Sequence, residues 1–331
     1  MDVPAQPRPT VAVVIPCYRE TAHIDAVLDA IPDMVDQVFV VDDACPDGTG
    51  AQVRARHEDP RIRVLGHERN RGVGAATVTG YRAALEAGAD IIVKLDGDGQ
   101  MPPALVPRFV APVLRGQCDY AKGNRFHRIE DTAAMPALRL AGNAALSFLS
   151  KLSTGYWQVF DPTNGFTAIH ARVLRALPLA KLDPGFFFES DMLFRLGTLR
   201  AVVLDVPMRA RYAGETSALR PSAVAAGFLA RHTRNFFKRL FYSYFLRDFQ
   251  VASIEWLLGP LLLLFGVYFG LAEWRAAAVN GTAATAGTVM LAALPVLIGV
   301  QLLLSALQFD VANQPRTPVH PMLGEAGDGG D

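Results

Sequence analysis

The stretch Ile91-Ile92-Val93-Lys94-Leu95-Asp96-Gly97-Asp98-Gly99-Gln100 decides how the rest of the chain is interpreted. Four of its first five residues are apolar, which predicts a buried β-strand. The strand ends at two carboxylates one residue apart, and the neighbouring glycines let the backbone turn tightly. Side chains at positions i and i+2 of a strand share one face, so Asp96 and Asp98 can converge on one ion. A polar turn is the simpler interpretation. A site for a hard divalent cation that also holds substrate phosphates is the functional one.

Apolar runs alternate with helical patterns through the first hundred residues. Further strands are predicted at 11–15, 38–41 and 61–65, and helices at 21–31 and about 74–87. This alternation favours a mostly parallel sheet with right-handed crossovers. In such sheets ligands bind outside the carboxyl ends of the strands. Polar side chains follow each predicted strand, so we expect a nucleotide pocket along that edge. They are Tyr18, Glu20, Asp42, Asp43, Asn70, Asp96 and Asp98.

Three charged residues in the second half of this region are further candidates. Arg125 follows a short predicted strand, and Arg139 lies on the helix after it. Each is either a surface charge or a bidentate clamp for an oxyanion. Asp191 lies at the start of another predicted helix, where an acid either stabilises the helix N-terminus or serves as a general base or orienting acid.

The overall composition excludes some classes of protein. The chain has 331 residues, of which 51% are hydrophobic. Lys+Arg and Asp+Glu both number 32, and without an excess of positive charge no nucleic-acid partner is expected. Cys17, Cys45 and Cys118 match no metal spacing and are interpreted as reduced thiols. The turn Gly72-x-Gly74 lacks the third glycine of a dinucleotide fingerprint, which disfavours a dehydrogenase. The polar, Pro-rich segment 1–10 predicts a flexible N-terminus without a signal peptide.

Beyond residue 250 the sequence becomes strongly apolar. Segments 251–272 and 283–309 are each long enough to cross a hydrocarbon core of about 30 Å, and the short turn between them predicts a transmembrane hairpin. Two buried core helices are the alternative. The region before the hairpin, 223–250, mixes basic and aromatic residues and is interpreted as an amphipathic helix lying in the lipid headgroups, or alternatively as a solvated basic helix. The positive-inside rule then places the large domain, 11–222, and the tail, 310–331, in the cytoplasm.

Four short motifs, taken together, resemble the family 2 glycosyltransferases with the GT-A fold. They are Val14-Ile15-Pro16-Cys17-Tyr18-Arg19-Glu20, Val40-Val41-Asp42-Asp43 with Pro46-Asp47-Gly48-Thr49, Asn70-Arg71-Gly72, and Asp96-Gly97-Asp98-Gly99-Gln100. With the hairpin, the whole resembles the polyprenyl-phosphate glycosyltransferases of the dolichol-phosphate mannose synthase class. The resemblance implies an α/β, Rossmann-like catalytic domain with a mostly parallel sheet, an interfacial helix and two membrane helices.

The resemblance also implies roles for residues of this sequence, which are expectations. Pro16, Tyr18, Glu20 and Asp43 would hold the base and ribose of the donor. Asp96, Asp98 and Gln100 would bind Mg²⁺ or Mn²⁺ at the diphosphate. Arg125 and Arg139 would contact the donor or lipid phosphate, and Arg211 would precede a Gly-Glu-Ser-like loop. The sequence departs from the family at Gly97-Asp98-Gly99, where Ala-Asp-Leu is usual, and at Ala218, where a basic residue is usual.

The activity implied is inverting transfer of a sugar from a UDP- or GDP-sugar to a polyprenyl phosphate at the cytoplasmic face of a bacterial inner membrane. The expected partners are this donor, this acceptor and membrane lipid. A further copy of the chain is a possible partner as well, since Gly287 and Gly299 of the second span could pack against it. A phosphate acceptor is already anionic, so Asp191 would orient rather than deprotonate it. Two alternatives remain: transfer to a hydroxyl of a lipid-linked glycan, and a non-catalytic scaffold that binds nucleotide sugar.

Overall fold

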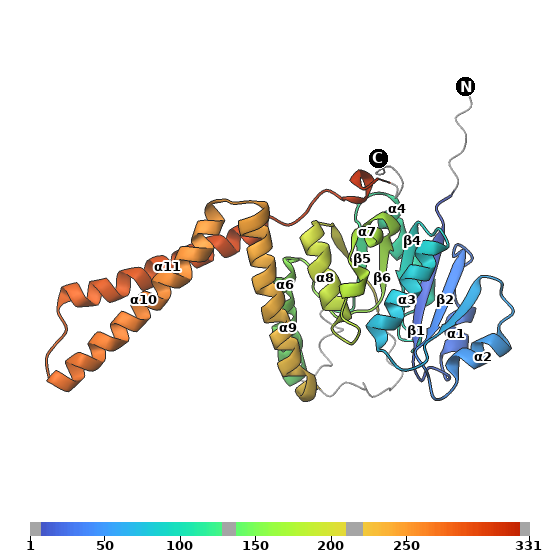
Figure 1. The fold of residues 1–331 in the computed structure, drawn as a ribbon, viewed down its shortest axis with the longest axis horizontal. Coiled ribbons are helices and arrows are strands. Elements are labelled where there is room, and N and C mark those ends of the chain that lie inside the picture. The colour runs from blue at the N-terminus through green and yellow to red at the C-terminus, as the bar shows by residue number, and fades with distance from the viewer. Residues whose placement is uncertain (1–7, 128–136, 210–220, 325–331) are drawn as a thin grey trace, which may run out of the picture. The chain divides into compact units, whose positions relative to one another are not determined.

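The computed structural model describes residues 8–127, 137–209 and 221–324, with the side chains of 137–141 and 221–224 left out (Figure 1). The chain divides into two compact units. Unit 1 comprises residues up to Phe236 together with those from Pro315 onward, and unit 2 comprises Phe237–Gln314. The segment that contains the two long apolar helices is therefore inserted, along the sequence, between two parts of the first unit.

Unit 1 is built on a seven-stranded sheet in the order β3-β2-β1-β4-β6-β5-β7. All neighbouring strands are parallel except β6, which runs antiparallel to both β4 and β5. The predicted mostly parallel sheet is thus confirmed. The strands are β1 (Val11–Cys17), β2 (Gln37–Asp42), β3 (Ile62–Gly66), β4 (Ile91–Lys94), β5 (Tyr120–Asn124), β6 (Thr167–His170) and β7 (Val203–Pro207).

Helices cover both faces of this sheet. One face carries α1 (Ile24–Asp29), α2 (Thr49–Arg56) and α4 (Val106–Leu114), which follows the short helix Pro103–Leu105. The other face carries α3 (Val73–Glu86), α7 (Ala171–Ala176) and α8 (Phe188–Leu199). The remaining helices of unit 1 are α6 (Ala137–Thr154), the short Leu179–Lys181 and His320–Met322, and most of α9 (Pro221–Phe241).

The alternation of side chains along β1 explains the two layers. Val11, Val13 and Ile15 are buried with α1 and α4, whereas Ala12 and Val14 are buried with α3. Every residue of β1 is buried, as expected for a parallel strand covered by helices on both faces. A Cβ on Gly80 of α3 would lie 2.3 Å from Val14, so the absence of a side chain there lets α3 lie directly on the sheet.

The end of the chain packs back onto unit 1. The Asp119 carboxylate, fully buried before β5, accepts hydrogen bonds from the backbone N–H groups of Val319 (3.0 Å) and His320 (2.9 Å), and lies 2.7 Å from the His320 Nδ1. The His320 ring stacks on His170 at the end of β6, with centroids 4.3 Å apart. Residues 315–324 of the predicted tail therefore form part of the folded domain.

Unit 2 consists of the end of α9, a π-helix (Tyr242–Arg247), α10 (Val251–Asn280) and α11 (Ala286–Ala312). α10 and α11 are long and apolar enough to cross a membrane, as predicted, although α10 continues to Asn280 rather than ending near residue 272. A Cβ on Gly299 would lie 2.7 Å from the Gly259 carbonyl oxygen, so glycines allow the two backbones to approach closely.

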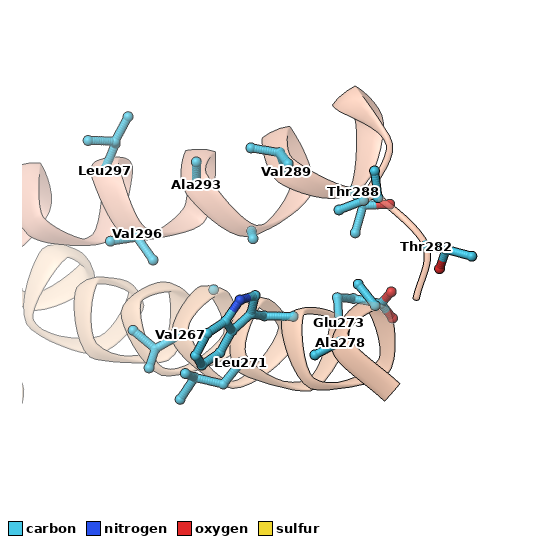
Figure 2. A pocket seen from close by; sticks show the side chains of 17 residues that line it. Val267, Leu271, Glu273, Ala278, Thr282, Thr288, Val289, Ala293, Val296 and Leu297 are labelled. Atoms are coloured by element: carbon cyan, nitrogen blue, oxygen red, sulfur yellow. The ribbon is translucent and has the colours of Figure 1, made fainter. Parts of the chain in front are cut away.

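Towards the turn between them, α10 and α11 line an apolar pocket of about 840 Å³ (Figure 2). Val267 and Leu271 of α10 and Val289 and Val296 of α11 are among its lining residues. The pocket contains none of the predicted site residues, so it plays no part in the candidate active site.

A buried ion pair joins the two ends of unit 2. Arg239, 5% exposed, donates to both carboxylate oxygens of Asp310 at 2.7 and 3.0 Å, and the Tyr244 hydroxyl donates to the same carboxylate at 2.6 Å. Arg239 belongs to the basic, aromatic region 223–250, which the sequence predicts to lie in the lipid headgroups or to be solvated. For Arg239 neither interpretation holds, because its charge is paired inside the protein.

Candidate active site

The loops after β1 and β4 lie against each other at the carboxyl edge of the sheet. A Cβ on Gly97 would lie 3.1 Å from the Cys17 sulfur and 3.3 Å from Glu20, so the predicted metal loop and the predicted base-binding loop are neighbours. Gly99 has φ +75°, a conformation that favours glycine. The turn is fixed by the Gln100 backbone N–H, which donates to Asp98 Oδ1 at 2.9 Å.

Asp96 belongs to a cluster of charges around the buried Lys94. The Lys94 ammonium donates to Asp96 Oδ1 at 2.8 Å and to Glu189 Oε1 at 3.0 Å. Burial alone disfavours the ammonium ion, but the two carboxylates outweigh it and raise the pKa of Lys94 above its usual value. Gly165 makes room for the cluster, since a Cβ there would lie 2.5 Å from Asp96 Oδ2 and 2.6 Å from Lys94 Nζ.

Asp43 holds the neighbouring turn together. Its carboxylate accepts hydrogen bonds from the backbone N–H groups of Arg71 (2.8 Å) and Gly72 (2.7 Å) and lies 2.6 Å from the His67 Nδ1. Asp43 is 2% exposed. It therefore positions the Asn70–Gly72 turn, while its predicted contact with the donor stays a prediction.

The side chains of the β1 loop differ in their exposure. Pro16 is buried, Glu20 is half-buried and Tyr18 is exposed. Arg19, whose guanidinium lies 5.5 Å from the Tyr18 ring centroid, has a left-handed φ of +65°. An exposed aromatic ring beside a cation suits stacking on a base.

The three predicted arginines differ in what the structure shows of them. Arg125 follows β5 and makes a bidentate pair with the fully buried Asp161, at 2.7 and 3.1 Å. Arg139 lies in α6, but its side chain is outside the described residues, as is all of Arg211. Arg125 is thus held at the carboxyl edge, and the phosphate contacts of all three stay predictions.

Asp191 is engaged within unit 1. Its Oδ2 accepts a hydrogen bond from Arg195 at 3.0 Å, one turn along α8, and another from the Asp183 backbone N–H at 3.1 Å. The Asn235 amide of α9 lies 3.5 Å from its other oxygen. The side chain is 2% exposed. These contacts fit an orienting role better than that of a free base.

A second pocket, of about 400 Å³, lies at the same edge, beside the ends of β5 and β7. Asn124, Phe126, Gln158, Phe160 and Asp205 are among its lining residues. Burial raises the pKa of Asp205 to about 6, and its Oδ1 has no hydrogen-bond partner within the described residues. The carboxyl edge therefore offers a polar, aromatic pocket some strands away from Asp96.

Sequence reasoning missed Lys94, Gly165 and Glu189. Lys94 stood as the one polar residue in an apolar strand, and that mismatch was the available signal. Glu189 lies two residues before Asp191, in the first turn of the same helix. Along a helix, residues two apart face different directions, so only one of the two can face the sheet edge. The contact of Gly165 with Asp96 joins parts of the chain far apart in sequence, which no local pattern reveals.

The donor set at Asp96 and Asp98 fits a hard divalent cation. No three His, Cys, Asp or Glu side chains converge into a closed metal cage in the described parts of the chain. Mg²⁺ and Mn²⁺ do not need one, because they use one or two carboxylates and complete their coordination with water and substrate phosphates. Asp96 Oδ2 makes no hydrogen bond with any described residue, so one oxygen is left as a ligand.

Comparisons with known proteins agree with this geometry. The family model described as glycosyl transferase family 2 matches residues 12–177, half of the chain. The undecaprenyl-phosphate mannosyltransferase of Micrococcus luteus is 34% identical over 203 residues, which cover 60% of this chain and 82% of the relative. The polyprenol monophosphomannose synthase of Mycolicibacterium smegmatis is 30% identical, covering 62% and 79%.

Solved structures show the same fold. Glucosyl-3-phosphoglycerate synthase from Mycobacterium tuberculosis, in complex with Mn²⁺, UDP-glucose and phosphoglyceric acid, aligns with a TM-score of 0.53 and 23% identity, covering 70% of this chain and 80% of that one. At this identity the likeness concerns the fold alone. The loops that meet at the carboxyl edge, the family model and the relatives lead to one conclusion: this chain is a glycosyltransferase and belongs to glycosyl transferase family 2.

Proposed function

We propose that the protein transfers a sugar from a UDP- or GDP-sugar to a polyprenyl phosphate, with inversion at the anomeric carbon. The observation that carries this proposal is the combination, in one chain, of the Asp96–Asp98 loop at the sheet edge and two helices long enough to cross a membrane. Two relatives bearing the names of polyprenyl-phosphate mannosyltransferases support it.

Different loops at the carboxyl edge of the sheet would bind different parts of the donor. The β1 loop, with Tyr18 and Glu20, would hold the base and ribose beside the Asp43-anchored turn. Asp96 and Asp98, with Gln100, would hold the diphosphate through Mg²⁺ or Mn²⁺. These residues would hold an ion whose Lewis acidity would stabilise the charge on the leaving nucleoside diphosphate.

On the acceptor side, Arg125 is held at the edge by Asp161, which fixes the plane of its guanidinium. A fixed, planar fork suits bidentate binding of phosphate oxygens. Arg139 and Arg211 would complete this binding. Because a phosphate acceptor is anionic at neutral pH, its oxygen attacks without prior deprotonation. The ion pair of Asp191 with Arg195 agrees with a reaction that needs no strong base.

The same chain organisation supports a membrane location with the catalytic unit in the cytoplasm, in a bacterial inner membrane. The chain leaves unit 1 before α10 and rejoins it after α11, so both ends of the hairpin belong on the side of the catalytic unit. Basic residues precede the first span, and only Arg275 lies near the turn at its far end.

The test is a turnover assay in detergent with undecaprenyl phosphate, Mg²⁺ or Mn²⁺, and a panel of UDP- and GDP-sugars, with product identified by mass. We expect a mass of the lipid phosphate plus one sugar, lost on chelation and in Asp98→Ala. Nucleotide release without a glycosylated lipid phosphate would favour transfer to a hydroxyl. Donor binding without release would favour a non-catalytic scaffold.

A further inference from the structure

Lys94 is a charged residue in a place where the fold alone does not require one. It ends β4, whose other residues, Ile91, Ile92 and Val93, are apolar and buried, and it is itself 1% exposed. Burying a charge is costly, and a buried ion pair can often be replaced by apolar residues of similar size without loss of stability. The stability of the sheet is therefore no sufficient reason for this lysine.

The Lys94 side chain, within the part of the chain that the structure describes, hydrogen-bonds to Asp96 of the candidate metal site and to one further carboxylate. Its ammonium contacts Asp96 Oδ1 and Glu189 Oε1, and Gly165 leaves the space in which these groups meet. Glu189 is half-buried, and its carboxylate comes from the first turn of α8, on a different layer of the fold from β4. The cluster thus joins the strand that carries Asp96 to a helix that packs on the sheet.

The charges of this cluster balance in a particular way. Lys94 alone would fix Asp96 but would also repel a divalent cation bound beside it. Glu189 adds one negative charge at 3.0 Å from the ammonium and cancels that repulsion. The formal charge of Lys94 plus Glu189 is zero, so the pair as a whole leaves the negative charge of Asp96 uncompensated.

We propose that Lys94 and Glu189 form a positioning pair for Asp96. Lys94 holds Oδ1 by a hydrogen bond but its charge repels the cation, and Glu189 compensates that charge, so that the charges of the pair, more than the hydrogen bond to Oδ1, set the affinity of the site. This inference rests on the proposed function in one respect, namely that a divalent cation binds at Asp96 and Asp98.

The proposal predicts opposite effects for the two members of the pair. Lys94→Met removes a repelling charge and should tighten Mn²⁺ binding, whereas Glu189→Gln leaves the lysine uncompensated and should weaken it. A unit charge about 6 Å from a divalent ion changes binding by about tenfold even at the dielectric constant of water. We therefore expect about a tenfold change in each direction, and a double variant within a few-fold of the wild type.

The experiment measures Mn²⁺ alone binding to the full chain in detergent, by the electron paramagnetic resonance signal of the free ion. Arg61→Met is the matched control, because it also removes the cation of an ion pair, but Arg61 pairs with Asp59 just before β3, at the opposite edge of the sheet from Asp96. It should change the affinity by less than about twofold. Glu189→Asp keeps the charge and should retain near-wild-type affinity, which preserves the test if Lys94→Met does not fold.

Each outcome decides between the alternatives. Opposite changes for Lys94→Met and Glu189→Gln support the pair. Weaker binding in both variants, in proportion to lost thermal stability, would show a merely structural ion pair and overturn the inference while leaving the metal site intact. Tightening of Mn²⁺ binding in Arg61→Met equal to that in Lys94→Met would show that only the net charge of the protein matters, and would also overturn the inference. A wild type that binds no Mn²⁺ would overturn the proposed metal dependence as well.

Discussion

Gly165→Ala is the smallest change that should disable the proposed metal site. The added Cβ would lie 2.5 Å from Asp96 Oδ2 and 2.6 Å from Lys94 Nζ, distances that real Cβ atoms essentially never show. To reach ordinary contact, the carboxylate must retreat by roughly 0.5–1 Å. The backbone of the loop cannot yield easily, because the Asn164 carbonyl accepts from buried Lys122 and the Asn164 side chain accepts from the Phe166 N–H.

The expected cost differs between stability and catalysis. Overpacking of this size destabilises a fold by about 1–3 kcal/mol. A displacement of about 1 Å at a reacting group can lower the rate about 100-fold. We therefore expect Gly165→Ala to remain folded at the assay temperature but to lose about 100-fold in turnover and to bind Mn²⁺ more weakly.

The assay compares turnover and thermal unfolding of Gly165→Ala with those of Gly227→Ala. Gly227 is an exposed glycine of α9 at which a Cβ would meet no atom within 4 Å. The control should keep its activity and gain up to about 1 kcal/mol from helix propensity. Wild-type turnover in Gly165→Ala, or a loss fully explained by the unfolded fraction, would refute the reasoning that Gly165 is needed for Asp96 to hold its place.

Three other substitutions test separate parts of the molecule. Asp98→Ala should lower turnover at least about 100-fold. If the acceptor is a phosphate, the turnover of Asp191→Asn per folded protein should stay within about tenfold of the wild type, because no general base is needed. Equal losses in the two variants would point to a hydroxyl acceptor. His232 Nδ1 lies 2.8 Å from the Ser153 hydroxyl, and burial lowers the pKa of His232 to about 4. Because the unfolded chain binds this proton at a higher pH than the folded one, the free energy of unfolding should fall by up to about 3 kcal/mol as the pH drops from 6.5 to 4. In His232→Gln the unfolding temperature should depend less on pH over this range. Asp310→Asn should cost about 3–5 kcal/mol in thermal unfolding, since it leaves the buried Arg239 without its carboxylate, and an unchanged unfolding temperature would contradict that account.

Local patterns were enough to predict the mostly parallel sheet and the edge at which the β1 and β4 loops meet. The apolar runs at 11–15, 38–41 and 61–65 lie within or next to β1, β2 and β3, and the helix predicted at 74–87 is α3, Val73–Glu86. These elements follow from periodicity and turn residues, which act over a few positions. Since parallel strands end at one edge, the meeting of the β1 and β4 loops also followed without knowledge of any contact.

Long-range partners were beyond such patterns. Asp43 and Asp191 look like free carboxylates in the sequence, but in the folded chain Asp43 accepts hydrogen bonds from Arg71 and Gly72, and the Asn235 amide lies 3.5 Å from Asp191. Arg239 looks like a surface cation until α11 brings Asp310 to it. Whether a charge is paired depends on tertiary contacts, and a single sequence contains no record of them.

The contact of Asp119 with residues 319 and 320 has a practical consequence for anyone who wants the catalytic unit without its membrane part. Deleting everything after residue 236 would remove three donors from a carboxylate that no water reaches. Such a protein should be less stable, or aggregate, for reasons unrelated to lipid. If residues 237–314 are replaced by a flexible linker that joins residue 236 to residue 315, the donors at residues 319 and 320 are kept. We therefore expect this internal deletion to give a soluble enzyme more readily than truncation after residue 236.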